Sequence, residues 1–262
     1  MNGKIYTPLK MREVFHLEFL RYFARKLEAE HYVLKGGVNL RFFFKSIRYS
    51  QDMDLDIHKI GVERVKKTAM DILSSRGFLD SLKSFGIQKV IPPDILKAKQ
   101  TETTQRFKIH LLTQGGEDLF TKVEFSRRGL KGSVVVEPVS TEVLRYYKMA
   151  PLLIPHYGAL SAVRQKIQAL AERSILQARD IFDLFLLSSQ CGALQRKDLQ
   201  VSTALLKTAH DNIFLVEFPQ FRDSVVAYLG SEDQKTYSWP AVWDEMKLTA
   251  AHFLEELKDE NA

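Results

Sequence analysis

The stretch 34–57 constrains the fold of this 262-residue chain more than any other part of it. A short apolar segment, 32–34, leads into Gly36 and Gly37, and a helical run follows over about 38–45. Two glycines at a strand-to-helix junction let a ligand come close to the backbone. The helix that follows adds free N–H groups and the positive end of its dipole, which suits an anion. The stretch therefore predicts a phosphate-binding turn between a strand and a helix.

Three carboxylates follow this turn with a period of two. Asp52, Asp54 and Asp56 fall on a segment, about 53–57, that reads as a strand, so all three should share one face. A solvent-exposed strand face would explain this spacing, and the run also begins like an EF-hand loop, but Ile57 stands where that loop needs glycine. Carboxylate oxygens beside a phosphate-binding turn instead favour Mg²⁺-assisted phosphoryl or nucleotidyl transfer.

These residues resemble the first motif of the abortive-infection toxin nucleotidyltransferases of the AbiEii/AbiGii type, in the DNA polymerase β-like nucleotidyltransferase superfamily. The resemblance implies that Asp52 and Asp54 are the catalytic, metal-binding aspartates and that Asp56 is an additional carboxylate. The superfamily often has Gly-Ser where this chain has two glycines. The residues that carry the resemblance are Lys35-Gly36-Gly37, Leu40-Arg41 and Arg48-Tyr49-Ser50-Gln51-Asp52-Met53-Asp54.

The same resemblance implies the nucleotide contacts. Gly36 and Gly37 are expected to hold the phosphates of a nucleoside triphosphate, together with Arg48 and with Ser50, which would supply a hydroxyl. Mg²⁺ is the expected cofactor and a nucleoside triphosphate (NTP) the expected co-substrate.

A β-hairpin is predicted further along the chain. Residues 106–112 and 119–126 both alternate apolar and polar side chains, and a glycine-containing turn joins them. On the second strand Glu124 lies on the polar face, where a lone glutamate is usually just exposed. Nucleotidyltransferases of this superfamily take a third carboxylate from a neighbouring strand, so the resemblance implies that Glu124 completes the metal site.

A second cluster of charges lies on two predicted helices, 161–173 and 178–189. Lys166 and Arg173 share a face of the first, and Asp180 and Asp183 are three residues apart on the second. Two packed helices held together by Arg–Asp pairs would account for this pattern. It also resembles a later motif of the same toxin family, which implies that Lys166 is a phosphate-binding or catalytic residue and that Asp180 belongs to the catalytic site.

Prolines mark the expected domain boundary. Pro151 and Pro155 divide the chain into a nucleotidyltransferase core, 1–150, and a helical region, 151–262, that completes the active site. The expected fold is α+β, a small mixed sheet with flanking helices followed by an α-helical C-terminal region. Within the core, a helix over about 60–77 is expected to end at Gly77.

Composition narrows the class of protein. The net charge of +6 permits an anionic partner such as RNA or a nucleotide. The single cysteine, Cys191, excludes an intrachain disulfide and fits a reducing cytoplasm. No apolar run is long enough to span a membrane, and the N-terminus has no signal-peptide pattern.

The resemblance implies a toxin of a toxin–antitoxin system that transfers a nucleoside monophosphate from an NTP, with a cognate antitoxin as partner. The 3′ end of tRNA is the preferred acceptor, because some relatives modify it. Two alternatives stay open: transfer onto a protein side chain, and a non-catalytic nucleic-acid-binding protein with the same fold. Intact Asp52, Asp54 and Glu124 argue against the second.

Overall fold

A computed structural model describes residues 6–95, 100–190 and 198–260 of the chain, so Cys191 lies outside the described residues. The chain forms two compact units. Unit 1 comprises residues 1–43, 49–130 and 134–156, and unit 2 comprises 44–48, 131–133 and 157–262. Unit 2 thus includes two short segments that the chain contributes from within the sequence of unit 1. The predicted division at residue 150 stays a prediction.

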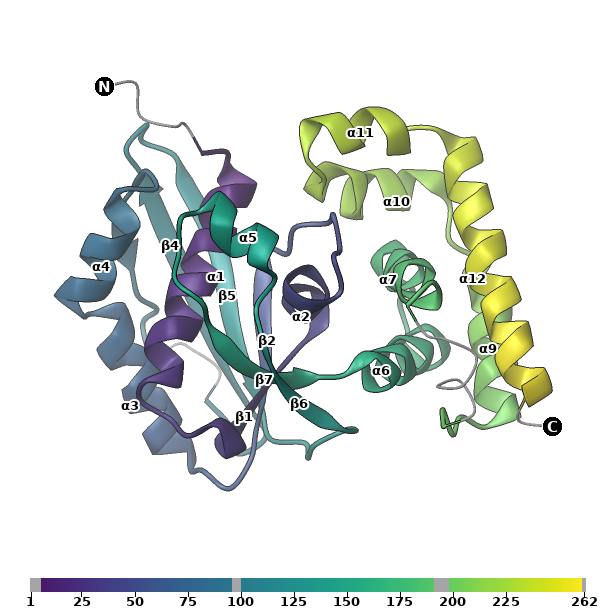
Figure 1. Cartoon of the computed structure of the whole chain (residues 1–262), viewed down its shortest axis with the longest axis horizontal. Helices are drawn as coiled ribbons and strands as arrows, with labels where there is room; N and C mark the ends of the chain where they lie inside the picture. The colour runs from purple at the N-terminus through teal and green to yellow at the C-terminus, as the bar shows by residue number, and fades with distance from the viewer. Residues whose placement is uncertain (1–5, 96–99, 191–197, 261–262) are drawn as a thin grey trace. The chain divides into compact units, whose positions relative to one another are not determined.

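A seven-stranded mixed sheet forms the centre of unit 1, in the order β3-β4-β5-β2-β1-β7-β6 (Figure 1). β1 pairs antiparallel with β2 and parallel with β7, β2 pairs parallel with β5, and β4 forms an antiparallel hairpin with β5. The strands span Tyr32–Lys35 (β1), Asp52–Ile57 (β2), Ile87–Ile91 (β3), Thr104–Thr113 (β4), Asp118–Ser126 (β5), Val134–Pro138 (β6) and Leu153–Tyr157 (β7).

Helices cover both faces of this sheet. On one face lie α1, α3 and α4, and on the other lies α2, which directly follows β1 (Figure 1). The fully buried ring of Phe23 on α1 stacks on Phe125 of β5, with 5.4 Å between ring centroids. The helical segments of unit 1 span Pro8–Ala24 (α1), Ala29–His31 (η1), Gly36–Phe43 (α2), Val62–Leu73 (α3), Arg76–Lys83 (α4) and Thr141–Tyr146 (α5).

The prediction that Gly77 ends a helix is wrong. α3 ends at Leu73, and Gly77 lies inside the first turn of the next helix, α4. Ser75 is the N-cap of α4, and its hydroxyl accepts a hydrogen bond from the Phe78 N–H. The serine therefore begins a new helix where the glycine was expected to end the old one.

The segment around Pro155 is a strand, although the prolines suggested a boundary there. Proline cannot donate a backbone hydrogen bond and normally argues against a central strand. β7 nevertheless adds to the sheet beside β1, with a register defined by the pair Leu34–His156.

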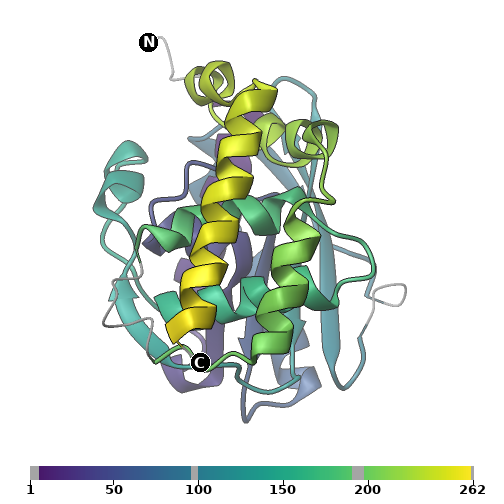
Figure 2. The same cartoon turned by 90° about the vertical axis from the view of Figure 1, so that its right-hand side faces the viewer.

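Unit 2 is helical apart from its short linking segments, and α12 runs along its length (Figure 2). α12 packs against α7 and α9, and its buried Trp243 stacks on Phe221 with ring centroids 4.3 Å apart. Among the residues described, no helix is long and apolar enough to cross a membrane. The helical segments are Ala159–Glu172 (α6), Ala178–Ser188 (α7), Thr203–Ile213 (α9), Phe218–Ser224 (α10), Val226–Tyr228 (η2), Ser231–Tyr237 (α11) and Pro240–Glu260 (α12).

A buried hydrogen-bond relay ties α1 to the start of β2. The Thr121 hydroxyl donates to the carbonyl of Gln51 at 2.7 Å, and His16 Nε2 lies 3.0 Å from the same hydroxyl oxygen. Because a hydroxyl has one hydrogen to donate, the His16 Nε2–H must be the donor in the second bond. Burial, with a smaller contribution from Arg12, lowers the pKa of His16 to about 3, so the imidazole is neutral.

This relay predicts a loss of stability in mild acid. The unfolded chain takes up a proton on His16 below about pH 6.5, whereas the folded chain does so only near pH 3. Stability that His16 contributes above pH 6.5 should therefore fall by about 1.4 kcal/mol per pH unit between those values. Urea unfolding at several pH values should show a shallower pH dependence for His16→Gln, whose amide can still donate to Thr121. His252→Gln, at an exposed site, controls for the substitution, and equal slopes in all three proteins would contradict the prediction.

Candidate functional site

The predicted carboxylates lie side by side on one face of the sheet in unit 1. The parallel register of β2 and β5 pairs Asp54 with Glu124, and Asp52 with Lys122. Side chains of paired residues point to the same face, so Asp52, Asp54 and Glu124 occupy adjacent positions on two neighbouring strands. The structure thus places Glu124 beside Asp52 and Asp54, although Glu124 follows Asp54 by 70 positions in the sequence.

Basic side chains neutralise this face. The Lys122 ammonium lies 3.3 Å from Asp52 Oδ2 and 3.6 Å from Glu124 Oε2, and Arg106 Nε donates to Glu124 Oε2 at 2.6 Å. Within the described part of the chain, ligand atoms of Asp52, Asp54 and Glu124 do not all lie within 4.8 Å of one another. Glu124 is held by two cations, and the three carboxylates would have to come closer together to share one ion.

Two observations fit a divalent cation at Asp52 and Asp54. The Oδ1 atom of Asp52 is buried and has no hydrogen-bond partner among the described residues. Burial is the main cause that raises the pKa of Asp54; Lys122 opposes this rise, and Glu124 adds to it. Asp52 thus keeps one buried oxygen free to bind a ligand, and the charge of Asp54 is poorly compensated. Hard oxygen donors of this kind are the ligands that Mg²⁺ prefers.

Gly36 lies directly against this carboxylate pair. Its φ of +70° is a backbone conformation that side chains disfavour, and a Cβ atom built at Gly36 would lie 3.1 Å from Asp54 Oδ2. Gly36 and Gly37 are the first two residues of α2, so the N-terminus of this helix begins beside Asp54. The close approach explains why glycine stands at position 36.

Gly36→Ala should reduce nucleotide transfer by roughly tenfold or more, since the added methyl group displaces Asp54. The positive φ should also cost about 1–2 kcal/mol of stability. Gly116→Ala is the matched control, because Gly116 has a φ of +83° and nothing within 4 Å of its Cβ position. Both variants should lose similar stability in thermal unfolding, and only Gly36→Ala should lose activity. Equal activity in the two variants would contradict a role for this contact.

Ser50 and Asp56 have structural contacts on either side of the aspartates. The Ser50 hydroxyl donates to the backbone carbonyl of Asp52 at 2.8 Å, which fixes the first residue of β2. Asp56 is 2% exposed and forms an ion pair with Lys35 at 2.5 Å. Asp56 therefore contacts a cation directly, whereas no cation in the described parts of the chain lies as close to Asp54.

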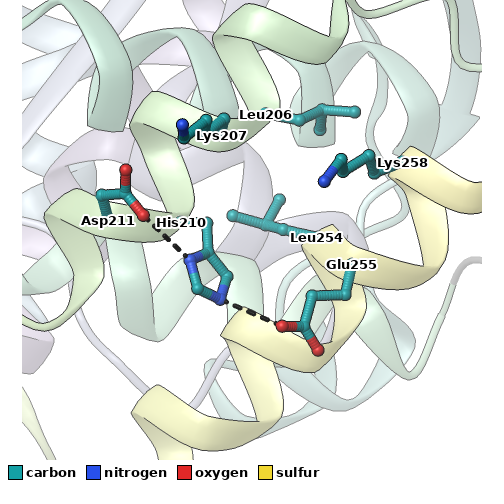
Figure 3. Close-up of a pocket in the computed structure, with 7 residues that line it drawn as sticks. All are labelled: Leu206, Lys207, His210, Asp211, Leu254, Glu255 and Lys258. Atoms are coloured by element: carbon teal, nitrogen blue, oxygen red, sulfur yellow. Dashed lines mark hydrogen bonds and ion pairs between the residues drawn. The ribbon is translucent and has the colours of Figure 1, made fainter.

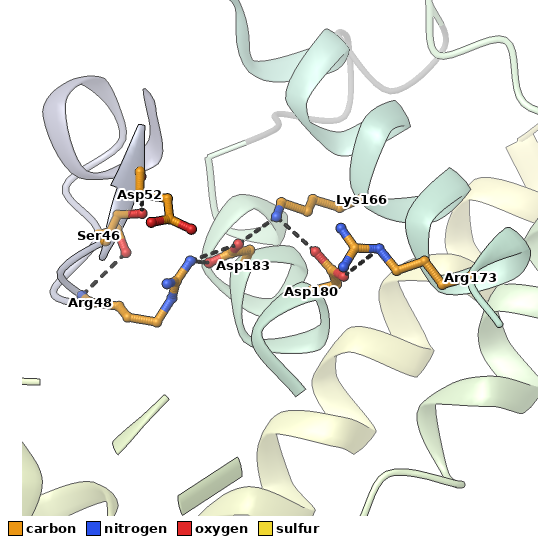
Figure 4. Close-up of polar contacts among 8 residues, drawn as sticks. Ser46, Arg48, Asp52, Lys166, Arg173, Asp180 and Asp183 are labelled. Atoms are coloured by element: carbon orange, nitrogen blue, oxygen red, sulfur yellow. Dashed lines mark hydrogen bonds and ion pairs between the residues drawn. The ribbon is translucent and has the colours of Figure 1, made fainter. Parts of the chain in front are cut away.

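The second predicted cluster is a buried network within unit 2 (Figure 4). The Lys166 ammonium contacts Asp180 at 2.9 Å and Asp183 at 2.6 Å. Arg173 Nε lies 3.3 Å from Asp180, and one guanidinium nitrogen of Arg48 donates to both oxygens of Asp183, at 3.0 and 3.1 Å. Arg48, predicted to bind nucleotide, is thus 5% exposed and holds a carboxylate.

The charges of this network stabilise one another. Burial by itself would raise the pKa of Asp183, but the Arg48 guanidinium and the Lys166 ammonium hold it below its ordinary range. Burial would lower the pKa of Lys166, whereas Asp180 and Asp183 raise it above its ordinary value. Lys166 and Asp183 therefore stay charged. The Oδ2 atom of Asp180 lies 3.3 Å from Arg173 Nε, but it is buried and makes no hydrogen bond to the described residues.

Three cations around the carboxylates had no predicted role in the site. Lys122 shares a strand face with Glu124 two residues away, and this spacing was visible in the sequence. Arg106 and Lys35 pair with carboxylates on other strands, and no local spacing predicts those pairs.

A pocket between α9 and α12 has no residue of either predicted cluster (Figure 3). His210 lies in its wall, with one ring nitrogen 3.3 Å from Asp211 and the other 3.3 Å from Glu255. The His210–Glu255 pair joins α9 to α12, whereas Asp211 lies on the same helix as His210. The residues that line this pocket are therefore different from those predicted to act on nucleotides.

Comparison with solved structures defines the class of fold. MenT4, a nucleotidyltransferase toxin from Mycobacterium tuberculosis H37Rv, superposes with a TM-score of 0.60 at 17% identity, covering 95% of this chain and 84% of that one. JHP933 from Helicobacter pylori superposes with a TM-score of 0.54 at 19% identity, covering 98% and 95%. The predicted α+β nucleotidyltransferase fold is thereby confirmed.

The family follows from the sequence itself. Residues 18–255 match the family described as nucleotidyl transferase AbiEii toxin of type IV toxin–antitoxin systems, and the chain belongs to this family. No curated protein gives a significant match. The family expected from the sequence is confirmed, and the chain is a nucleotidyltransferase. Membership implies an NTP as substrate, usually a divalent metal ion, and an antitoxin as partner.

Proposed function

We propose that this toxin uses Mg²⁺ bound by Asp52, Asp54 and Glu124 to transfer a nucleoside monophosphate from an NTP to the 3′ end of a tRNA. The observation that carries the proposal is the pairing of Asp54 with Glu124 beside Asp52, whose buried oxygen has no partner among the described residues. When bound, Mg²⁺ would neutralise phosphate charge and favour ionisation of the acceptor hydroxyl.

Residues of the chain would position the two reactants. The N–H groups at Gly36, Gly37 and the start of α2 are suited to the outer phosphates of the NTP. The acceptor hydroxyl gives up its proton to solvent and its oxygen forms a bond to the α-phosphorus. The bond from that phosphorus to the bridging oxygen breaks, and pyrophosphate leaves with the electron pair. We assign Lys166 to the leaving group, with Asp180 holding the lysine.

Labelled NTPs test this function directly. The protein is incubated with each α-labelled NTP, Mg²⁺ and either purified tRNA or a protein extract free of nucleic acid. The expected result is label on tRNA that requires Mg²⁺ and is absent with EDTA. Label on protein alone would show that the acceptor is a protein and not tRNA. No transfer to either fraction would contradict the proposed reaction.

A further inference from the structure

Two rows of cationic and aromatic side chains continue the carboxylate face outward onto β4. The antiparallel register of β4 and β5 pairs Lys108 with Lys122, and His110 with Phe120. Strand alternation places all four side chains on the face that carries Glu124. Lys122 already contacts Asp52 and Glu124, so the rows begin at the proposed metal site.

Lys108 lies opposite a like charge. Directly paired lysines on neighbouring strands destabilise a sheet unless an anion lies between them or nearby. The carboxylates of Asp52 and Glu124 compensate Lys122. Lys108 is exposed, and it has no ion pair or hydrogen bond within the described ranges. Lys108 is therefore a cation, beside the already paired Lys122, for which the described residues supply no anion.

The neighbouring aromatic row narrows the class of anion. Phe120 is half-buried, and the His110 ring packs edge-on against it, with ring centroids 5.7 Å apart. Lysines beside an aromatic ring combine a backbone contact with a surface on which a base can stack, as in proteins that bind single-stranded nucleic acid. An inorganic anion or an acidic peptide would use the lysines without needing Phe120.

The sheet order separates this surface from the proposed donor site. Gly36 follows β1, and the order β4-β5-β2-β1 places Lys108 and Gly36 on opposite sides of the carboxylates. Strands are spaced by about 4.8 Å, so β1 and β4 lie roughly 14 Å apart in the sheet. A phosphate bound at Lys108 would therefore not be one of the NTP phosphates bound at Gly36.

We propose that Lys108, Lys122 and Phe120 bind the acceptor: the two lysines take a phosphodiester of a single-stranded RNA end, and Phe120 stacks on a base next to it. The proposal rests on the proposed function, because it takes the acceptor to be RNA. It adds the residues that hold the acceptor beside the carboxylates.

Charge reversal at Lys108 tests the phosphodiester contact. The probe is a fluorescently labelled single-stranded oligoribonucleotide, and its binding is followed by anisotropy without NTP or Mg²⁺. Lys108→Glu should weaken binding by roughly tenfold or more and make the slope of log K against log salt shallower by about 0.7 to 1. Lys67→Glu makes the same charge change at an exposed position of α3, on the opposite face of the sheet (Figure 1), and should bind like wild type.

A second arm distinguishes the acceptor from the donor. Binding of an NTP alone should change by less than about twofold in Lys108→Glu, because the outer phosphates lie at Gly36. Loss of NTP binding together with unchanged oligonucleotide binding would overturn the proposal and place the lysines at the donor.

Phe120 provides a test that does not depend on charge. Phe120→Leu should weaken oligonucleotide binding by roughly fivefold or more, and Phe120→Trp should retain it, because tryptophan can still stack on a base. Equal binding by Lys108→Glu, Phe120→Leu and wild type would overturn the proposal, even if the wild-type protein transfers nucleotide to tRNA. Conversely, oligonucleotide binding that depends on Lys108 in a protein that labels no acceptor would support this surface and contradict the proposed reaction.

Discussion

Asp54→Asn should abolish nucleotide transfer and leave the folded chain at least as stable as wild type. Asparagine keeps the shape of the side chain but removes the negative charge that a divalent ion needs, so transfer should fall by on the order of 10³-fold. Burial and the neighbouring carboxylates raise the pKa of Asp54, which means that the fold disfavours its charged form. Removing the charge should therefore not lower the unfolding temperature, measured in EDTA near pH 8.

Asp56→Asn is the matched control, two positions along the same strand. Asp56 is buried and paired with Lys35, so its substitution should lower the unfolding temperature. Its transfer rate per folded molecule should stay near that of wild type. If Asp54→Asn transferred nucleotide at the wild-type rate, or if Asp56→Asn were the inactive variant, the assignment of the metal ligands would be wrong.

The period-two spacing of Asp52 and Asp54 was enough to place them on one strand face, because strand geometry depends only on local sequence. Alternation likewise placed Glu124 on the polar face of its strand. The register that sets Glu124 beside Asp54 is a long-range property, and it was anticipated through the family resemblance rather than through the spacing. Which cations hold Glu124 could not be predicted, since Arg106 comes from another strand.

Other features depended on tertiary contacts that outweigh local signals. Pro155 argued against a strand, yet pairing with β1 places it in one. Gly77 was expected to end a helix, but the Ser75 cap begins a new helix around it. The pair between Arg48 and Asp183 joins residues 135 positions apart, and no spacing in the sequence indicates it.

Lys166→Met should lower nucleotide transfer by on the order of 10²-fold, the effect of removing one preorganised electrostatic group. It should also lower the free energy of unfolding by about 3–5 kcal/mol, because Asp180 and Asp183 would remain buried without their shared cation. Activity and stability would then fall together, and the single variant cannot separate a contact with substrate from support of the fold. Urea unfolding and transfer assays on the same preparations give both quantities.

The double variant Lys166→Met with Asp180→Asn separates the two roles. Removing a carboxylate along with the lysine restores the charge balance around Asp183, which keeps its Arg48 partner. Stability should therefore recover in part, relative to Lys166→Met alone. If Lys166 acts on the leaving pyrophosphate, transfer stays low in the double variant, and Lys166→Arg recovers only part of it, because a planar guanidinium does not replace a compact ammonium. If transfer instead recovers in step with stability, and Asp180→Asn alone is active, Lys166 serves to neutralise the aspartates and the assignment to pyrophosphate is wrong.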